Sequence, residues 1–260
     1  MQSSTLFVLD FQGKAIDYPG FLSKELFKKK FVDNMKRYIQ YAQRIISKFS
    51  TAAAFRLDQR YQQYGNRGQY GNQIKEEIDR LLLALKDLRP KNILEIGTSR
   101  GRLLFRFAEL ATPGATMVGI DIKFPDGKDT IYAHIPAGHN VILLEADSHA
   151  SSTVKQVENF FPSSIDFLFI DGDHSYEGVK LDFLCYFRLV RPGGMIVFHD
   201  IVNDFRTRYG VATYSNVGGV PKFWQEIKKD YEYTELINNS QQDGFGMGII
   251  YIKGEQKINK

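Results

Sequence analysis

The chain has 260 residues, of which 43% are hydrophobic and 25% are charged, as in ordinary soluble globular proteins, and its length suits one α/β domain with a small addition. Its net charge of +4 is too mild to indicate a nucleic-acid partner, and its single cysteine, Cys185, excludes an internal disulfide or a multi-cysteine metal site. No segment approaches the roughly 20 consecutive apolar residues of a membrane span, so we expect a soluble, cytoplasmic protein without a membrane partner.

Residues 1–72 are expected to form an N-terminal helical extension with a lid-like loop. A short apolar alternation around Gly13 is compatible with a small hairpin within residues 1–19. An amphipathic helix is predicted over residues 23–61, because apolar side chains recur there at steps of three and four: Phe27, Phe31, Met35, Tyr38, Ala42, Ile45 and Phe49. This stripe has to pack on another surface, so we expect it to cover the main domain or to join the subunits of a homo-oligomer. Residues 61–72, rich in glycine, glutamine, asparagine and tyrosine, predict a loop that is either a mobile lid or an inert connector.

Strand and helix patterns alternate through residues 73–260. An amphipathic helix over residues 74–85 precedes a series of short apolar runs, which predict strands at 92–96, 116–122, 141–144, 167–170, 195–198, 231–237 and 247–252. The β-α alternation with a closing pair of strands predicts a Rossmann-like, doubly wound α/β sheet.

Polar side chains gather at the ends of the runs at 167–170 and 195–198. They are Asp171, Asp173, His174, His199 and Asp200. A helical crossover, predicted by the apolar period from Val179 through Val190, joins the two runs. The strands are therefore parallel and finish at the same edge of the sheet, about 4.8 Å apart. Ligands of open α/β sheets bind outside that edge. The sequence therefore predicts a functional site there.

A glycine-containing turn connects the first strand of this domain to the next helix. Its spacing is Gly97-x-x-x-Gly101, which differs from the Gly-x-Gly-x-x-Gly fingerprint of dinucleotide-binding proteins. Glycines in such a turn let the backbone approach a ligand closely. Asp121 ends the next strand, where an acid can accept hydrogen bonds from ribose hydroxyls, and Asp147 with Ser148 ends the third, where they can meet an adenine edge. Each acid alone could be an ordinary strand-end residue, but together they indicate a nucleoside-containing ligand.

The sequence resembles the class I S-adenosylmethionine-dependent methyltransferases in five runs: NILEIGTSRG, MVGIDI, LLEADS, FLFIDGDHSYEGVKLD and LVRPGGMIVFHDI. Within that class it is similar to the small-molecule O-methyltransferases of the cephalosporin-hydroxylase-like branch, and more distantly to catechol and macrolide-sugar O-methyltransferases. The resemblance covers about residues 73–253. It implies a seven-stranded sheet of order 3-2-1-4-5-7-6 with strand 7 antiparallel, S-adenosylmethionine as cofactor, and methyl transfer to a hydroxyl of a small molecule such as a sugar or a natural product.

The same resemblance implies roles for individual residues. The cofactor would be held by Glu95, Gly97, Thr98, Gly101, Asp121, Asp147, Ser148 and Asp171, with Glu95, Gly97 and Gly101 around the methionine part, Asp121 at the ribose, and Asp147 and Ser148 at the adenine. In metal-dependent relatives, an acid after the fourth strand and a pair of residues after the fifth bind a divalent cation; carried over, these are Asp171, His199 and Asp200. The relatives usually have Asp-Asp or Asp-Asn at that pair. A histidine there shifts the preference from Mg²⁺ toward Mn²⁺, iron or Zn²⁺.

The proton acceptor has two candidates. In the sugar-modifying relatives the acid two residues after the first metal ligand is the general base, which here is Asp173. His174 competes with it, because the ordinary pKa of histidine lies near neutrality. Three interpretations of the cluster stay open: a divalent metal that orients a diol, a metal-free base (His174 or His199), and acids that only cap neighbouring loops.

Other functions are compatible with parts of the pattern. An NAD-dependent oxidoreductase would share the sheet, but the glycine spacing does not suit a pyrophosphate. A nucleic-acid base N-methyltransferase would usually carry Asn/Asp-Pro-Pro-aromatic after the fourth strand, where this chain has Asp-Gly-Asp-His. A non-catalytic or regulatory module that binds S-adenosylmethionine remains the main alternative.

Overall fold

The structure is a computed structural model that describes residues 6–9, 15–18 and 73–253. The helix predicted for residues 23–61 and the loop predicted for residues 61–72 lie outside the described residues. The chain divides into two units, Met1–Arg67 and Gly68–Lys260. In the first unit, β1 (Leu6–Leu9) and β2 (Ala15–Tyr18) pair antiparallel, as expected for a hairpin within residues 1–19.

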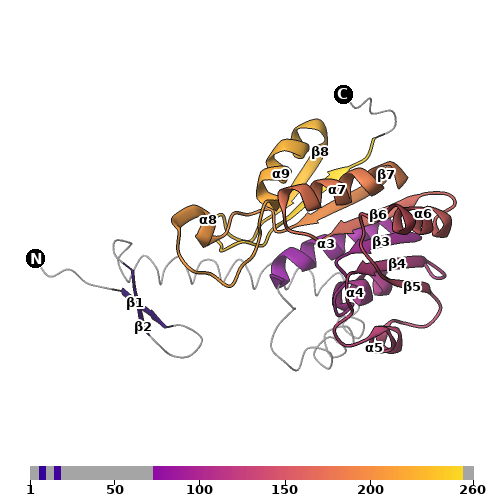
Figure 1. The fold of residues 1–260 in the computed structure, drawn as a ribbon, viewed down its shortest axis with the longest axis horizontal. Helices are drawn as coiled ribbons and strands as arrows, with labels where there is room; N and C mark the ends of the chain where they lie inside the picture. The colour runs from indigo at the N-terminus through magenta and orange to yellow at the C-terminus, as the bar shows by residue number, and fades with distance from the viewer. Residues whose placement is uncertain (1–5, 10–14, 19–72, 254–260) are drawn as a thin grey trace, which may run out of the picture. The chain divides into compact units, whose positions relative to one another are not determined.

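A seven-stranded sheet of order β5-β4-β3-β6-β7-β9-β8 forms the frame of the second unit (Figure 1). Its strands are β3 (Asn92–Ile96), β4 (Thr116–Asp121), β5 (Asn140–Glu145), β6 (Ile165–Ile170), β7 (Val190–His199), β8 (Glu232–Leu236) and β9 (Met247–Tyr251). The first five strands pair in parallel, and β9 runs antiparallel between β7 and β8. Counted within this sheet alone, the order is 3-2-1-4-5-7-6, so the predicted fold class is confirmed.

Helices cover both faces of the sheet because the parallel strands are apolar on both sides. The helices are α3 (Lys75–Leu88), α4 (Arg102–Leu110), α5 (Lys128–His134), α6 (Ser151–Phe160), α7 (Tyr176–Tyr186), α8 (Phe205–Tyr209) and α9 (Val220–Ile227), with short 3₁₀ turns η1 (Phe187–Leu189) and η2 (Lys228–Asp230). Along β6, Phe167 and Phe169 belong to one core cluster with α3 and α4, whereas Leu168 and Ile170 belong to the other with α6, α7 and α9. This alternation follows from the two-residue period of a strand.

The helix predicted to run from Val179 through Val190 is shorter in the structure. α7 ends at Tyr186, η1 follows, and β7 already begins at Val190. The pairing of β6 with β7 shifts register between Ile165 and Phe167, so the Pro192-Gly193 stretch lies at an irregular start of β7. No helix in the described part of the chain combines the length and the apolar character that a membrane crossing needs.

Candidate active site

The glycine turn after β3 brings two neighbouring loops into backbone contact. Gly97 has a φ of +84°, and a Cβ atom placed on it would lie 1.9 Å from the carbonyl oxygen of Asp171. The amides of Gly97 and Thr98 both donate to the carbonyl of Ile120, at 2.9 and 3.1 Å. Only glycine fits position 97, since any side chain would clash with the loop after β6 and strain the backbone.

Glu95 lies at the end of β3 with 1% of its surface exposed. Its Oε2 atom is buried and has no hydrogen-bond partner among the described residues. Burial raises the pKa of Glu95 well above its ordinary value, and the charges of Asp171 and Asp121 add to that effect. A buried carboxyl oxygen without a donor is costly, so this position is suited to a positively charged ligand group that would restore the ionised form.

Asp121 ends β4 and bridges two loops through both carboxylate oxygens. Its Oδ2 accepts from Ser99 N at 2.7 Å, and its Oδ1 accepts from Lys123 N at 2.9 Å. Each oxygen keeps a further lone pair for hydroxyl donors. Ile122 follows with 74% of its surface exposed, which offers an apolar face beside that acid. The sequence analysis missed Ile122, although an apolar residue directly after a strand-end acid was a usable signal.

The loop after β5 carries Asp147 and Ser148 at the same edge of the sheet. Asp147 is exposed and its Oδ1 accepts from His149 N at 2.8 Å. The hydroxyl of Ser148 donates to Oδ1 of Asp182 in α7, at 2.7 Å. The sequence analysis missed Asp182; the available signal was an acid on the buried face that includes Val179.

Two carboxylates and two imidazoles meet where β6 and β7 end. Nδ1 of His199 lies 3.1 Å from Asp171 Oδ1 and 3.3 Å from Asp200 Oδ1. His174 lies on the other side, with Nε2 at 3.3 Å from Asp171 Oδ1 and Nδ1 at 3.3 Å from Asp200 Oδ2. Each acid is therefore bordered by both histidines, as the parallel strand ends predicted.

One ligand atom from each of Asp171, His174 and Asp200 lies within 4.8 Å of the others, a spacing that could hold a metal ion. His199 is not in this set; it lies behind the carboxylates with 3% of its side chain exposed. Asp200 has a φ of +62°, which is uncommon for a residue other than glycine and typical of functional sites. The role of His199 as a metal ligand remains a prediction, and His174 is the histidine in the candidate donor set.

The charges of the cluster depend on one another. Burial opposes ionisation of Asp171, but the charges and hydrogen bonds of His199 and His174 outweigh it and lower the pKa of Asp171 to about 2. The hydrogen bond to Asp171 raises the pKa of His174 to about 9 against the effect of burial. Burial disfavours the charged form of His199, but Asp171 and Asp200 raise its pKa well above the ordinary value. Asp171 and the two histidines thus favour one another's charged forms.

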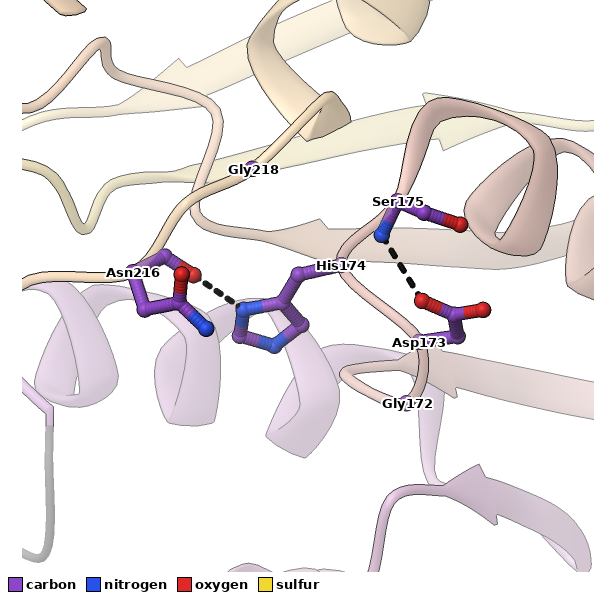
Figure 2. Close-up of a pocket in the computed structure, with 6 residues that line it drawn as sticks. All are labelled: Gly172, Asp173, His174, Ser175, Asn216 and Gly218. Atoms are coloured by element: carbon purple, nitrogen blue, oxygen red, sulfur yellow. Dashed lines mark hydrogen bonds between the residues drawn. The ribbon is translucent and has the colours of Figure 1, made fainter.

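A cavity of about 360 Å³ opens beside the cluster (Figure 2). Its lining consists of Gly172, Asp173, His174, Ser175, Asn216 and Gly218. Nδ1 of His174 donates to the carbonyl oxygen of Asn216, and the carbonyl of His174 accepts from Gly219 N at 2.7 Å. The segment before α9 therefore forms one wall of this cavity, which the motif analysis did not include.

The two predicted base candidates point in different directions (Figure 2). Asp173 turns toward the start of α7, where its Oδ1 accepts from Ser175 N at 2.8 Å and its side chain packs on Gly178. His174 turns toward Asn216 and the carboxylates. Of the two candidates, His174 is the one in contact with Asp171 and Asp200.

Gln73 reaches the cluster from the segment before α3. Its Nε2 donates to Asp171 Oδ2 at 3.2 Å, and its Oε1 is buried without a partner among the described residues. No local motif marks Gln73, because the two side chains are 98 positions apart in the sequence.

Comparisons with known proteins agree with this geometry. Residues 94–201 match the family model of a methyltransferase domain. The match covers less than half of the chain. The matched part begins in β3 and ends just after Asp200, so it contains the glycine turn and the Asp171–Asp200 cluster, whereas Gln73 and Asn216 lie outside it.

Two solved structures are similar in fold to this chain. The O-methyltransferase TomG from Streptomyces achromogenes, in complex with SAM, is 17% identical, with a TM-score of 0.56 over 76% of this chain and 89% of that chain. The O-methyltransferase from Bacillus cereus, in complex with SAH, is 19% identical, with a TM-score of 0.56 over 82% of this chain and 96% of that chain.

Two uncharacterized proteins are similar in sequence. One, from Acanthamoeba polyphaga mimivirus, is 39% identical over 79 residues, which are 30% of this chain and 34% of that protein. The other, y4gI of Sinorhizobium fredii, is 27% identical over 168 residues, which are 62% of this chain and 17% of that protein. The matches thus span at most about a third of the length of these relatives.

Proposed function

We propose that the protein is an S-adenosylmethionine-dependent O-methyltransferase that acts on a hydroxyl of a small molecule, such as a sugar or a natural product. The observation that carries the proposal is the contact between two half-sites: the glycine turn at Gly97, and the cluster that begins at Asp171, whose carbonyl oxygen faces that glycine. A ligand held by the first half-site would present its reactive end to the second. The complexes of the two structural relatives with SAM and SAH support this choice of cofactor.

The first half-site offers matching groups for each part of such a cofactor. Glu95 supplies a buried, unpartnered oxygen for an ammonium group, and Asp121 keeps lone pairs for ribose hydroxyls. Ile122 offers an apolar face for a base, with Asp147 and Ser148 at its edge. When bound, the cofactor supplies a methyl group that its sulfonium already activates, so the protein has only to place a nucleophile in line and to help remove its proton.

The second half-site fits a divalent cation. Two carboxylates and one imidazole suit Mn²⁺ or Zn²⁺, and Mg²⁺ would be held mainly through Asp171 and Asp200. His199 contacts both carboxylates from the buried side and would hold them in position. A bound cation would lower the pKa of the acceptor hydroxyl and fix the orientation of a diol.

A metal-free reaction with a histidine base is the second candidate. It is favoured by the position of His174, which lies between the two carboxylates. The raised pKa of His174, about 9, opposes it, because a protonated imidazole cannot accept the proton of a hydroxyl at neutral pH. If His174 stays protonated, Asp173 would be the base, although its carboxylate is turned toward α7.

The proposal is tested first by binding. Calorimetry of the purified protein should show binding of S-adenosylhomocysteine and none of NAD. Methyl transfer from S-adenosylmethionine to a panel of sugars, catechols and hydroxylated natural products should then depend on the enzyme. Activity that is lost in chelator and restored by Mg²⁺, Mn²⁺ or Zn²⁺, and lost in Asp171→Asn and Asp200→Asn, supports the cation site.

Other results point elsewhere. Full activity in chelator that is lost only in His174→Ala would assign the reaction to a histidine base. Binding of S-adenosylhomocysteine without transfer to any hydroxyl would favour a regulatory module. Tight binding of NAD without a response to S-adenosylhomocysteine would refute the proposal as a whole.

We also propose that residues 73–260 are the catalytic domain and that residues 1–72 form a helical extension through which the protein assembles as a cytoplasmic homo-oligomer. The apolar stripe from Phe27 to Phe49 supports this, because an exposed stripe of that length would favour aggregation. Removing residues 1–60 should change the molar mass measured by light scattering or make the protein insoluble. An active truncated protein with an unchanged oligomeric state would contradict it.

A further inference from the structure

Helix α7 carries a fully buried carboxylate beneath the loop that follows β5. Asp182 has 0% of its surface exposed and shares the buried face of α7 with Val179, Phe183 and Tyr186. A carboxylate in such a position is costly unless it is paired, so its partners show what it is for.

Those partners all belong to one loop. Ser148 Oγ donates to Asp182 Oδ1 at 2.7 Å, and His149 Nε2 lies 3.0 Å from the same oxygen. Tyr186, one turn further along α7, donates its hydroxyl to the carbonyl of Ser148 at 2.6 Å. The side chain of Asp147, the exposed acid of the same loop, accepts a hydrogen bond from His149 N at 2.8 Å. The side chain and the backbone of Ser148 are thus both fixed from α7.

This contact determines whether the Ser148 hydroxyl can donate or only accept a hydrogen bond from a ligand. A serine has one proton to donate, and that proton points at Asp182, so the lone pairs that remain can only accept. Burial raises the pKa of Asp182, and its hydrogen bond to Ser148 and the charge of His149 act in the opposite direction. In the ionised form both carboxylate oxygens can only accept, so Oδ1 takes the proton of Ser148.

We propose that Asp182 is a positioning residue that makes Ser148 a hydrogen-bond acceptor for the exocyclic amino group of adenine. It would thereby select an adenosyl cofactor against one whose base carries a carbonyl at that position. The inference rests on the proposed function, because it requires S-adenosylmethionine to bind with its ribose at Asp121 on β4 and its base at the adjacent end of β5. A carbonyl oxygen in place of the amino group would face the lone pairs of Ser148 and could not be paired while Asp182 holds the proton.

The test compares S-adenosylhomocysteine with S-inosylhomocysteine, which differs in having that carbonyl, by calorimetry on the full-length protein. The wild type should bind the inosyl compound at least about tenfold more weakly. Ser148→Ala should weaken the binding of S-adenosylhomocysteine about tenfold and leave the binding of the inosyl compound nearly unchanged. Asp182→Asn can turn an amide N–H toward Ser148 and free its proton, so the ratio of the two dissociation constants should fall toward one.

Asp166→Asn is the matched control. Asp166 is also buried, with 8% of its surface exposed, and accepts hydrogen bonds from Lys91 N and Asn92 N at 2.7 and 2.8 Å. It lies near the first residue of β6, whereas the site follows the last residue of that strand. Its substitution should leave the ratio unchanged even if stability falls. If Asp182→Asn does not fold, Ser148→Ala decides, since it removes a single hydroxyl from a loop.

Two results would overturn the inference. An unchanged ratio in Ser148→Ala and in folded Asp182→Asn would show that Ser148 does not read the base. A ratio of the two dissociation constants that falls toward one only in Asp147→Asn would show that Asp147 selects the base. Failure of the wild type to bind S-adenosylhomocysteine at all would instead refute the proposed function, and with it the premise of this inference.

Discussion

Divalent cation binding to the cluster of Asp171, His174 and Asp200 should weaken as the pH falls below about 9. A cation can bind His174 only when a ring nitrogen is free of its proton, and the pKa of His174 is raised to about 9 by its hydrogen bond to Asp171. Nδ1 of His174 donates its proton to the carbonyl of Asn216 in a hydrogen bond, whereas Nε2 faces Asp171. The cation should therefore displace the proton on Nε2. Binding should therefore release about one proton.

The magnitude follows from the difference between the pKa and the working pH. At pH 7 a group with a pKa of about 9 is neutral in about 1% of molecules, so the apparent affinity for Mn²⁺ should be about 100-fold below its plateau. Between pH 7 and pH 9 the logarithm of the association constant should rise with a slope of about one. Asp171 adds nothing to this slope, because its pKa of about 2 keeps it ionised throughout.

Calorimetric titration of the full-length protein with Mn²⁺ measures both quantities. The slope comes from titrations between pH 7 and pH 9, and the proton count from buffers of different ionisation enthalpy at pH 7. His174→Gln should lower the affinity at pH 9 and reduce the slope to about zero. His134→Gln, on α5, serves as the control and should keep the slope. An affinity that is independent of pH, with no proton released, would refute the assignment of His174 to the cation site.

Three further predictions concern the frame of the site. Gly97→Ala should abolish binding of S-adenosylhomocysteine in calorimetry and lower the free energy of unfolding by at least about 2 kcal/mol, because the new Cβ would lie 1.9 Å from the Asp171 carbonyl at a positive φ. Asp121→Ala should abolish that binding and leave thermal stability within a few degrees. Glu77→Leu should lower the free energy of unfolding, measured with denaturant, by about 2–4 kcal/mol, since it removes the acceptor of Gly246 N and Asn238 N in the loop between β8 and β9. An unchanged unfolding midpoint would show that these hydrogen bonds do not stabilise the fold.

The frame of the fold was predictable because hydrophobic periodicity and chain direction determine it. Runs such as residues 167–170 are apolar without interruption, which is typical of parallel strands covered on both faces. Once the crossovers make those strands parallel, the residues that follow them must meet at one edge, so Asp171 and Asp200 were expected to be neighbours before any coordinates were known.

The details of the site were not predictable from local sequence. The sequence indicated His199, with Asp171 and Asp200, as a metal ligand and His174 as a candidate base. The structure adds His174 to the side chains that could hold a cation, through the left-handed backbone of Asp200 and the contact of His174 with Asn216. Gln73 depends likewise on tertiary packing, because nothing in its neighbourhood marks it as a partner of Asp171.

The difference in exposure between the two histidines suggests how the cluster would serve a catalytic cycle. Two carboxylates this close would repel each other, and the imidazolium groups of His174 and His199 relieve that repulsion when no cation is bound. His174 has 27% of its side chain exposed and lines the cavity, whereas His199 has 3% exposed. On the proposed function, an entering cation would therefore displace the proton of His174 and leave His199 charged behind the acids. With His199 protonated, the side chains of the site would carry a net charge of −1, against −3 for a site made of three carboxylates. The smaller negative charge should weaken the binding of a hard cation such as Mg²⁺ more than that of Mn²⁺ or Zn²⁺, since these gain a bond to the imidazole nitrogen.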